Sequence, residues 1–381
     1  MTLALPRAVL RADALLARLA AGANLLTRFT PENAATERAR LVACLRRGHA
    51  EAPRWTYAGR FDGSGSKREI RIARDDLGVD PLSRTYRRRL AKLRLQIDLL
   101  EAVGDPARVL TASRRVYGVV DDVARSVADA WLAHPVHPER RDLPPVGPRG
   151  TPSVAATLRA EMLEYGLLCP FRVEPRLAAS AAVAPGEVIL GGTRGYSLEE
   201  AQRLAAHEIG VHLVAQQNAA DQPLAIFAIG TAGATRDQEG LALWAEVARG
   251  VFTPHRRRGI AARTLAVALL ADGSTFPEAA RALVLRGVDA EEAVYACERA
   301  FRGGGLTKDA AYVSGFLRVG RALARGGLDV EAMSVGRVGL RDRPIVRALL
   351  DAGVLAMPRR RSRELVRLAR TPIAAPLGAF H

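Results

Sequence analysis

The stretch that most constrains the predicted fold is His207-Glu208-Ile209-Gly210-Val211-His212. Its two histidines are separated by a step of five residues, which on a regular α-helix leaves their side chains roughly 140° out of register. One π-helical turn, which winds at about 4.4 residues per turn, brings them back to within ~50° of each other. Gly210 lies inside this turn, where a residue without Cβ tolerates altered backbone geometry. We therefore predict a helix from about Ser197 to Gln216 that is π-helical between His207 and His212.

A further glutamate, Glu239, follows in the segment Gln238-Glu239-Gly240-Leu241-Ala242, on the next long predicted helix. Two imidazoles and a carboxylate form the ligand set of a catalytic zinc site, in which the fourth position stays open. Each residue also has an ordinary interpretation. A single histidine on a helix is usually a surface or core residue, and Glu239 fits a first-turn glutamate that complements the helix dipole. The combination favours a metal-dependent peptidase.

Three motifs together resemble a known family. They are Ala205 to His212, Gln238 to Ala242, and Leu306 to Tyr312 with the sequence Leu-Thr-Lys-Asp-Ala-Ala-Tyr. In this order they look like the bacterial QEGLA-motif proteins, historically labelled as modulating flavohaemoglobin expression. That family is similar to the microtubule-associated tyrosine carboxypeptidases, which remove a C-terminal tyrosine from tubulin. The resemblance covers roughly residues 150 to 325.

The resemblance implies zinc as the cofactor, with His207, His212 and Glu239 as its ligands. It also implies Glu208 as the catalytic glutamate. The chemistry agrees, because zinc lowers the pKa of bound water to about 7 and polarises the scissile carbonyl, while a carboxylate can accept the water proton and pass it to the leaving amine. Glu246 lies two turns beyond Glu239 on the same predicted face. It is placed either to accept a hydrogen bond from a ligand histidine or to be an ordinary solvated glutamate.

The segment before the histidines predicts a small β-hairpin. Two short apolar runs, 171–182 and 187–190, are separated by a turn that contains Pro and Gly. In zinc peptidases of similar layout, an edge strand beside the metal helix binds the substrate backbone by strand addition. We expect residues 187–192 to be that edge. Gly191 and Gly192 are then candidate substrate-binding residues, because they allow close approach of another backbone.

Lys308 is one of only three lysines in a chain rich in arginine. A lysine kept inside a motif suggests that a compact point charge is needed there, and that a planar guanidinium would not serve. Tyr312 follows four residues later, on the same predicted face. Lys308 or Tyr312 is therefore a candidate to stabilise the oxyanion or to anchor the substrate. The alternative is a lysine salt-bridged to a neighbouring helix and a tyrosine packed in the wall.

A carboxypeptidase must also bind a terminal carboxylate, which arginine recognises with two parallel hydrogen bonds. Arg194, Arg299 and Arg302 are the candidates, because they lie next to the motifs. Two basic clusters, Arg256 to Arg258 and Arg359 to Arg361, could bind phosphates. No aromatic residues are interleaved with them, so we interpret both clusters mainly as solvated faces.

Composition sets limits on the remaining properties. The chain has 381 residues, of which 49% are hydrophobic, and a formal net charge of +16. This charge would attract a polyanion such as an acidic peptide tail, whereas the lack of interleaved aromatic residues makes nucleic acid a weaker expectation. The three cysteines, Cys44, Cys169 and Cys297, are widely spaced and suit a reduced, cytoplasmic interior. No uncharged run is long enough to predict a membrane span.

The patterns predict an α+β protein dominated by helices, with a small antiparallel sheet near a zincin-like metallopeptidase core. Residues 1–142 are predicted as a mainly helical N-terminal region, 143–150 as a linker rich in Pro and Gly, and 151–381 as the catalytic domain. The helices expected after Glu239 are Pro277–Arg286, Ala290–Arg302, Lys308–Arg325, Pro344–Ala352 and Ser362–Ala369.

Taken together, the sequence predicts a zinc metallopeptidase of the carboxypeptidase type, acting on the C-terminus of a peptide or protein. The C-terminal position, and tyrosine as the residue removed, follow from the resemblance alone. The alternative is a non-catalytic regulatory or binding protein, with a structural zinc or a basic nucleic-acid-binding surface. A structural zinc normally has four protein ligands, and no fourth Cys or His lies within the motifs.

Overall fold

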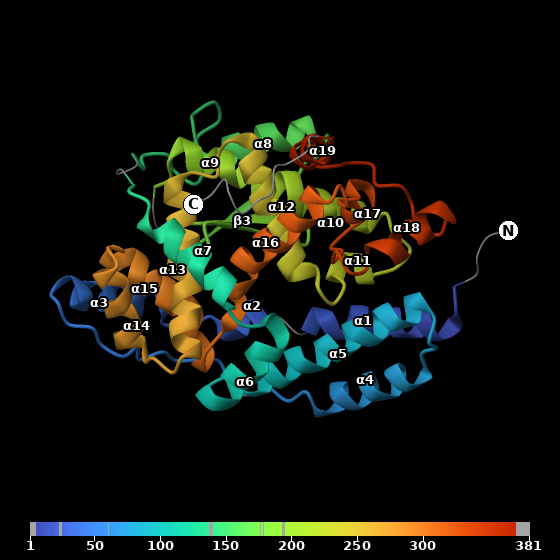
Figure 1. Cartoon of the computed structure of the whole chain (residues 1–381), viewed down its shortest axis with the longest axis horizontal. Helices are drawn as coiled ribbons and strands as arrows, with labels where there is room; N and C mark the ends of the chain where they lie inside the picture. Colours follow the sequence, from blue (N-terminus) through green and yellow to red (C-terminus); the bar gives the residue numbers. More distant parts are fainter. Residues whose placement is uncertain are drawn as a thin grey trace.

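The computed structural model of the chain describes residues 5–22, 25–59, 61–136, 140–175, 177, 179–192 and 195–370. The first part of the described chain is helical (Figure 1). Its helices are α1 (Arg7–Gly22), α2 (Leu25–Phe29), α3 (Ala34–Arg46), α4 (Ser64–Asp76), α5 (Pro81–Glu101), α6 (Pro106–Tyr117) and α7 (Asp122–Ala133).

The middle part contains the strands and the histidine motif. Its elements are α8 (Val154–Glu164), β1 (Phe171–Glu174), β2 (Ala181–Ala184), β3 (Glu187–Gly191), α9 (Leu198–Leu204), η1 (Ala205–Leu213), α10 (Val214–Ala220), α11 (Ile226–Ile229) and α12 (Ala234–Arg249). The last part is again helical, with α13 (Pro254–Ala271), α14 (Phe276–Leu285), α15 (Ala290–Phe301), η2 (Arg302–Gly304), η3 (Thr307–Asp309), α16 (Ala310–Ala324), α17 (Val330–Ser334), α18 (Arg343–Asp351) and α19 (Arg363–Arg370). The fold is thus α+β and mostly helical, and the helices predicted after Glu239 are confirmed to within two residues at each end.

The sheet is small and mixed. Its strand order is β1-β3-β2, with β1 parallel and β2 antiparallel to β3. The predicted hairpin corresponds to β2 and β3, which are joined by a turn at Pro185 and Gly186. The prediction of an antiparallel sheet was incomplete, because the 171–182 run splits into two strands and its first half pairs with the other side of β3. A zincin-like arrangement of this core stays a prediction.

β3 lies in the centre of the sheet, so the predicted edge position of residues 187–192 is wrong. Both of its sides are already paired, and a substrate cannot add to it as a further strand. Gly191 is needed for a different reason: a Cβ there would lie 2.9 Å from the carbonyl oxygen of Ala179. A Cβ on Gly192 would lie 2.4 Å from a methyl carbon of Val173. Both glycines allow close packing within the sheet. The edge position on which their predicted role with substrate depended is not present.

α12 and α16 approach each other closely at a pair of glycines. A Cβ on Gly240 would lie 2.3 Å from the carbonyl oxygen of Gly315, and a Cβ on Gly315 would lie 2.2 Å from that of Arg236. One turn further along, the Trp244 indole donates a hydrogen bond to the Phe316 carbonyl at 2.8 Å and stacks on the Phe316 ring. The glycine of the Gln-Glu-Gly-Leu-Ala motif therefore sets the distance between these two helices.

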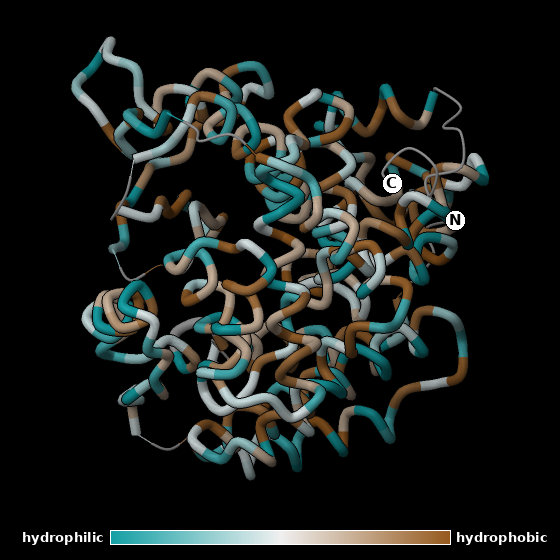
Figure 2. The backbone as a smooth tube through the Cα atoms, turned by 60° about the vertical axis from the view of Figure 1, so that its left-hand side comes forward, coloured by the Kyte–Doolittle hydropathy of each residue, from teal (hydrophilic) through white to brown (hydrophobic). Residues whose placement is uncertain are grey.

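The N-terminal helices pack directly against the rest of the molecule, where α1, α4, α5 and α6 form the lower layer of Figure 1. The main hydrophobic cluster includes Val9 of α1, Trp131 of α7 and Trp244 of α12. In Figure 2, hydrophobic and hydrophilic residues alternate along many helices, as expected when one face of each is buried. The division of the chain into an N-terminal region, a linker and a catalytic domain stays a prediction.

Asp13 shows how closely the N-terminal helix is attached. Its buried carboxylate accepts a hydrogen bond from the Tyr86 hydroxyl at 2.7 Å, and bonds from the backbone N–H groups of Ala225 and Ile226 at 2.8 and 2.9 Å. The predicted linker is also attached, because Leu143 forms a β-bridge with Tyr196, just before α9. Segments far apart in sequence therefore support the region around the histidine motif.

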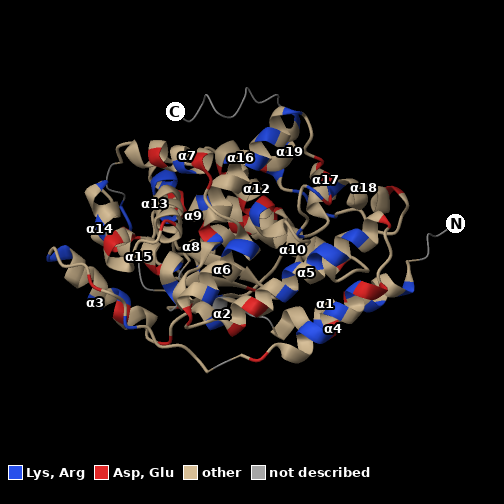
Figure 3. Ribbon diagram, turned by 60° about the horizontal axis from the view of Figure 1, so that its bottom comes forward, with Lys and Arg blue, Asp and Glu red and all other residues tan. Residues whose placement is uncertain are grey.

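Basic residues are distributed over many helices, among them α1, α4, α5, α13 and α19 (Figure 3). The interpretation of Arg256 to Arg258 as a solvated face is wrong, because Arg256 is largely buried on Glu246 and Arg258 donates to the carbonyls of Leu132 and Gly287. In the second cluster, Arg359 to Arg361, the side chains bind acidic side chains or backbone carbonyls of their own chain. Intramolecular contacts thus occupy both clusters.

No helix in the described ranges is long and apolar enough to cross a membrane. The three cysteines, Cys44, Cys169 and Cys297, form no disulfide. A cytoplasmic location stays a prediction.

Candidate functional site

The histidine motif lies on one continuous helix that changes its winding in the middle. α9 leads into η1, a π-helix from Ala205 to Leu213, which leads into α10. The predicted π-helical segment is thus confirmed. Its consequence is that the rings of His207 and His212 come together, with centroids 4.9 Å apart and planes at 77°. Ser197 caps the start of this helix by accepting a hydrogen bond from the Glu200 N–H at 3.1 Å.

Glu239, on the second turn of α12, meets the two histidines. A ligand atom of His207, of His212 and of Glu239 can be chosen so that all lie within 4.8 Å of one another, the only such metal-binding group in the described part of the chain. Oε2 of Glu239 lies 3.5 Å from Nε2 of His207 and is buried without a hydrogen-bond partner among the described residues. A buried carboxylate oxygen without a partner is costly. The residues therefore fit a divalent cation such as zinc, which would satisfy this oxygen and accept both imidazoles.

The pKa values of the site residues are shifted in different directions. Burial, together with the neighbouring charge of His207, lowers the pKa of His212 to about 3. Burial by itself raises the pKa of Glu239, but its contact with His207 and the nearby charges hold that pKa well below its usual range. Burial likewise opposes the charged form of His207, yet its contacts with Glu239 and Glu246 raise its pKa to about 9. A neutral His212 and an ionised Glu239 are in the protonation states that metal ligands require.

Glu246 contacts the ring nitrogen of His207 that is not the one near Glu239. Its Oε1 lies 2.7 Å from Nδ1 of His207, in a completely buried position. Arg256, at the start of α13, donates two hydrogen bonds to the same carboxylate, from Nε at 3.0 Å and from Nη2 at 2.9 Å. Burial opposes the ionisation of Glu246, but the charge of Arg256 and the contact with His207 keep its pKa well below its usual range. An ionised Glu246 orients the ring so that Nε2 of His207 faces Glu239.

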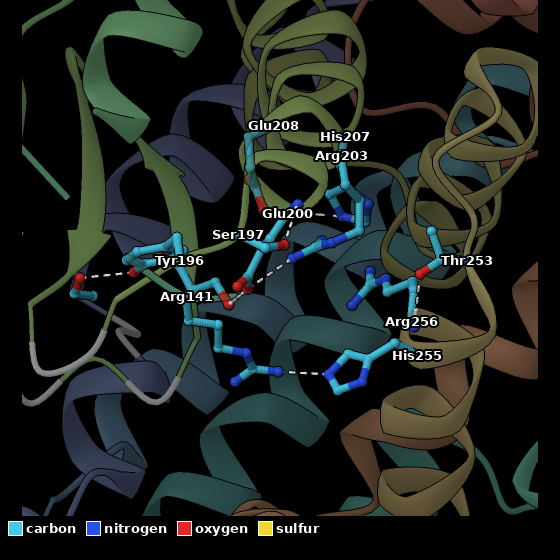
Figure 4. A network of polar contacts seen from close by, with 12 residues as sticks. Arg141, Tyr196, Ser197, Glu200, Arg203, His207, Glu208, Thr253, His255 and Arg256 are labelled. Carbon is cyan, nitrogen blue, oxygen red and sulfur yellow. Dashed lines mark hydrogen bonds and ion pairs between the residues drawn. The ribbon is translucent and has the colours of Figure 1, made fainter. Parts of the chain in front are cut away.

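Arg203, one turn before His207 on the same helix, adds a second cation to this group. Its Nη1 lies 3.8 Å from Glu246, and its Nη2 donates to Glu200 at 3.3 Å. Figure 4 shows Arg203 and His207 on one helix and Arg256 on α13 facing the same space. We call Glu246, Arg256 and Arg203 the paired cluster. Sequence reasoning missed both arginines, although Arg203 is placed four residues before His207, on the same helix face.

Glu208 follows His207 and lies beside the proposed metal ligands. Its Oε1 is 4.0 Å from Nε2 of His207, and the side chain is 11% exposed. Burial raises the pKa of Glu208 to about 7. A carboxylate with this pKa can both accept and release a proton near neutrality, as a general acid–base group must.

Lys308 and Tyr312 also lie near Glu239, on segments other than the one that carries the histidines. Lys308 is in η3 and partly buried, and it is an electrostatic neighbour of Glu239, which is also a neighbour of Tyr312. Burial lowers the pKa of Lys308 from its ordinary value. The Tyr312 ring, on α16, packs under the Arg263 guanidinium at 4.6 Å. Both side chains are thus brought to the site by the turn between α15 and α16.

The three arginines predicted for a terminal carboxylate differ in their surroundings. Arg299 is bound by Asp309, with Nε and Nη2 at 2.5 and 2.6 Å from its two carboxylate oxygens, which argues against a role with substrate. Arg302 is buried near Lys308. Arg194 lies outside the described residues.

Comparison with known families assigns the chain. The sequence model of the family described as microtubule-associated tyrosine carboxypeptidase matches residues 44–372. Neither the curated proteins nor the solved structures gave a match. The match covers most of the chain, including α4 to α7 and every proposed ligand, and extends well beyond the three motifs. The chain therefore belongs to the microtubule-associated tyrosine carboxypeptidase family.

Proposed function

We propose that this protein is a zinc-dependent carboxypeptidase that removes the C-terminal residue of a peptide or protein. The observation that carries the proposal is the convergence of His207, His212 and Glu239, with a buried oxygen of Glu239 that has no hydrogen-bond partner in the described part of the chain. Zinc bound by these residues would polarise the scissile carbonyl and acidify a water molecule. The carboxypeptidase type is supported by the family to which the chain belongs.

The protein residues have separate tasks in this proposal. Glu208 accepts a proton from the attacking water and delivers it to the leaving amine, for which a pKa of about 7 is well matched. Glu246 and Arg256 keep the His207 ring fixed, so that its Nε2 is presented to the metal. Tyr312 is the proposed donor to the negative charge that develops on the carbonyl oxygen, and Lys308 is the proposed anchor for the substrate.

The identity of the residue removed is a further part of the proposal. The family description names tyrosine, and we propose tyrosine at the C-terminus of a protein as the first substrate to test. The net charge of +16 favours a substrate with acidic residues before its C-terminus.

A peptide library with free C-termini tests this function. Reconstituted with zinc, the wild-type chain is expected to shorten library members by one residue, with tyrosine removed fastest, as followed by mass spectrometry. The matched control is Glu208→Gln, which keeps the size of the side chain and removes its basicity. Internal cleavage would make the protein an endopeptidase. No cleavage by a zinc-loaded chain would favour the regulatory alternative.

A further inference from the structure

A glycine turn holds two cations near the proposed metal ligands. It runs Arg302-Gly303-Gly304-Gly305-Leu306-Thr307-Lys308, and its three glycines have φ of 70°, 110° and 136°. Other residues rarely adopt these values. A Cβ on Gly303 would lie 2.4 Å from a Phe29 ring carbon, and one on Gly304 would lie 2.8 Å from Cα of Pro106. The turn is therefore pressed against neighbouring segments, which fixes the positions of Arg302 and Lys308.

Arg302 is a buried cation that forms no ion pair among the described residues, although the charges of Asp309 and Glu298 reach it. Arg302 is 3% exposed, and its Nε makes no hydrogen bond with any described residue. Among the residues that the structure describes, no carboxylate forms an ion pair with it. Arg299, three residues earlier and equally buried, is bound by both oxygens of Asp309. Because burying an unpaired charge is costly, Arg302 has the property of a group kept for an anion that binds from outside.

Tyr117 brings a hydroxyl donor to the same place. Ser113, one turn earlier on α6, accepts a hydrogen bond from the Thr307 N–H at 2.7 Å. Residues four apart share a helix face, so Tyr117 lies next to the turn that holds Lys308. It is an electrostatic neighbour of both Arg302 and Arg337. Its hydroxyl has no hydrogen-bond partner in the described ranges of the chain, and burial raises its pKa to about 12, so it remains a donor at neutral pH.

Arg337 completes the group from a different segment. Its backbone is fixed by hydrogen bonds to Phe227 and Thr231, at 2.8 and 3.0 Å, while its side chain is exposed. No ion pair of this side chain is found within the part of the chain that the structure covers. Arg337 and Lys308 are both electrostatic neighbours of Glu239 and His212. We call Arg302, Lys308, Arg337 and Tyr117 the unpaired cluster.

We propose that the unpaired cluster binds the free α-carboxylate of the last residue of the substrate. The inference rests on the proposed function and names the groups that make it specific for chain ends. In a peptide, one carbon atom separates the scissile nitrogen from the terminal carboxylate. The groups that bind that carboxylate must therefore lie beside the metal ligands, which is where Lys308 and Arg337 lie. Guanidinium, ammonium and phenol groups without partners are all donors, as a carboxylate requires.

The test is a binding measurement that needs no hydrolysis. In the Glu208→Gln background, loaded with zinc, we would titrate a glutamate-rich decapeptide ending in tyrosine, once as the free acid and once as the C-terminal amide. The free acid is expected to bind at least about tenfold more tightly, as the loss of charge-assisted hydrogen bonds implies. Arg302→Met and Arg337→Gln are each expected to weaken binding of the acid severalfold and to leave binding of the amide unchanged. Arg71→Gln, on the exposed side of α4, is the matched control and should change neither.

A third peptide separates the two possible sources of carboxylate. Replacing its internal glutamates by glutamine keeps the terminal carboxylate, so the difference between acid and amide should persist. Equal binding of acid and amide, failure of both to bind, or loss of the difference with the glutamine peptide would overturn the inference. An equal and tight affinity, together with cleavage inside peptides, would remove this carboxylate site and keep a zinc peptidase. A preference for the acid, together with no hydrolysis by the zinc-loaded wild-type chain, would keep the site and remove the proposed function.

Discussion

Two groups of charged residues near the His207–Glu239 pair are built in opposite ways. In the paired cluster, the carboxylate of Glu246 is completely buried and neutralised by Arg256, with Arg203 behind it. In the unpaired cluster, to which Lys308 belongs, the cations form no ion pair with a carboxylate among the described residues. Buried charges that have partners hold a structure in place, whereas buried charges without partners weaken it unless a ligand supplies the counter-charge. We infer from the comparison that the paired cluster holds a proposed metal ligand in place and that the unpaired cluster is available to an anion.

The largest effect is expected for Glu208→Gln, which leaves both clusters intact. Because this side chain moves the proton in our proposal, turnover should fall by about 10⁴-fold, the upper end of what a general acid–base group contributes. Steady-state kinetics on a peptide ending in tyrosine measures it, and zinc content and thermal unfolding should match the wild type. Residual turnover within tenfold of the wild type would remove Glu208 from this role.

Arg256→Met breaks the paired cluster. It leaves the buried Glu246 carboxylate with His207 and, at 3.8 Å, Arg203 as its remaining partners, so the free energy of unfolding should fall by about 3 kcal/mol. Zinc affinity, measured by competition with a chelator, should fall about 10- to 100-fold, because the orientation of His207 is loosened. Arg257→Met is the matched control, on the same helix and without an acidic partner within the described ranges. Equal effects of the two substitutions would contradict the role of the pair.

Gly240→Ala changes the spacing between α12 and α16. α12 carries both Glu239 and Glu246, and a Cβ at Gly240 would lie 2.3 Å from the Gly315 carbonyl oxygen. The helices must separate, at a cost of about 2 kcal/mol in the free energy of unfolding. Urea denaturation measures this cost. Gly65→Ala on α4, where a Cβ would meet nothing within 4 Å, is the control. A fully stable Gly240→Ala variant would mean that the close approach of α12 and α16 is not needed.

Arg302→Met tests the unpaired cluster through stability. Removing a buried cation without a partner should leave the free energy of unfolding within about 1 kcal/mol of the wild type or raise it, the reverse of Arg256→Met. Both variants would be measured by urea denaturation of the zinc-loaded chain without peptide. A loss above about 2 kcal/mol would make Arg302 a structural residue and would remove the contrast between the paired cluster and the unpaired cluster.

Much of this arrangement could be predicted from local sequence. The five-residue spacing of the histidines required a π-helical turn, and the structure has one from Ala205 to Leu213. Helix ends were accurate because capping residues and apolar periodicity are local signals. For Glu246, two helical turns beyond Glu239, the sequence left two alternatives, a partner of a histidine or a solvated glutamate, and the structure shows it on His207.

Other features depend on contacts between distant segments and could not be predicted. The central position of β3 depends on pairing with β1, and no pattern within either strand specifies its neighbour. Arg256 was interpreted as part of a solvated run because its partner, Glu246, lies on another helix. Arg337 and Tyr117 come to the same place from segments far apart in the sequence. The glycines after Arg302 were a usable signal that the sequence interpretation did not exploit.

Metal analysis tests the central claim most directly. After reconstitution with zinc and dialysis, elemental analysis should find about one zinc ion per chain in the wild type and in Glu208→Gln. The double variant His212→Ala, Glu239→Ala should hold less than about a tenth of that amount while keeping its helical circular dichroism, because one imidazole alone binds zinc weakly. A wild-type chain that retains no zinc, or a double variant that still binds one ion, would contradict the account.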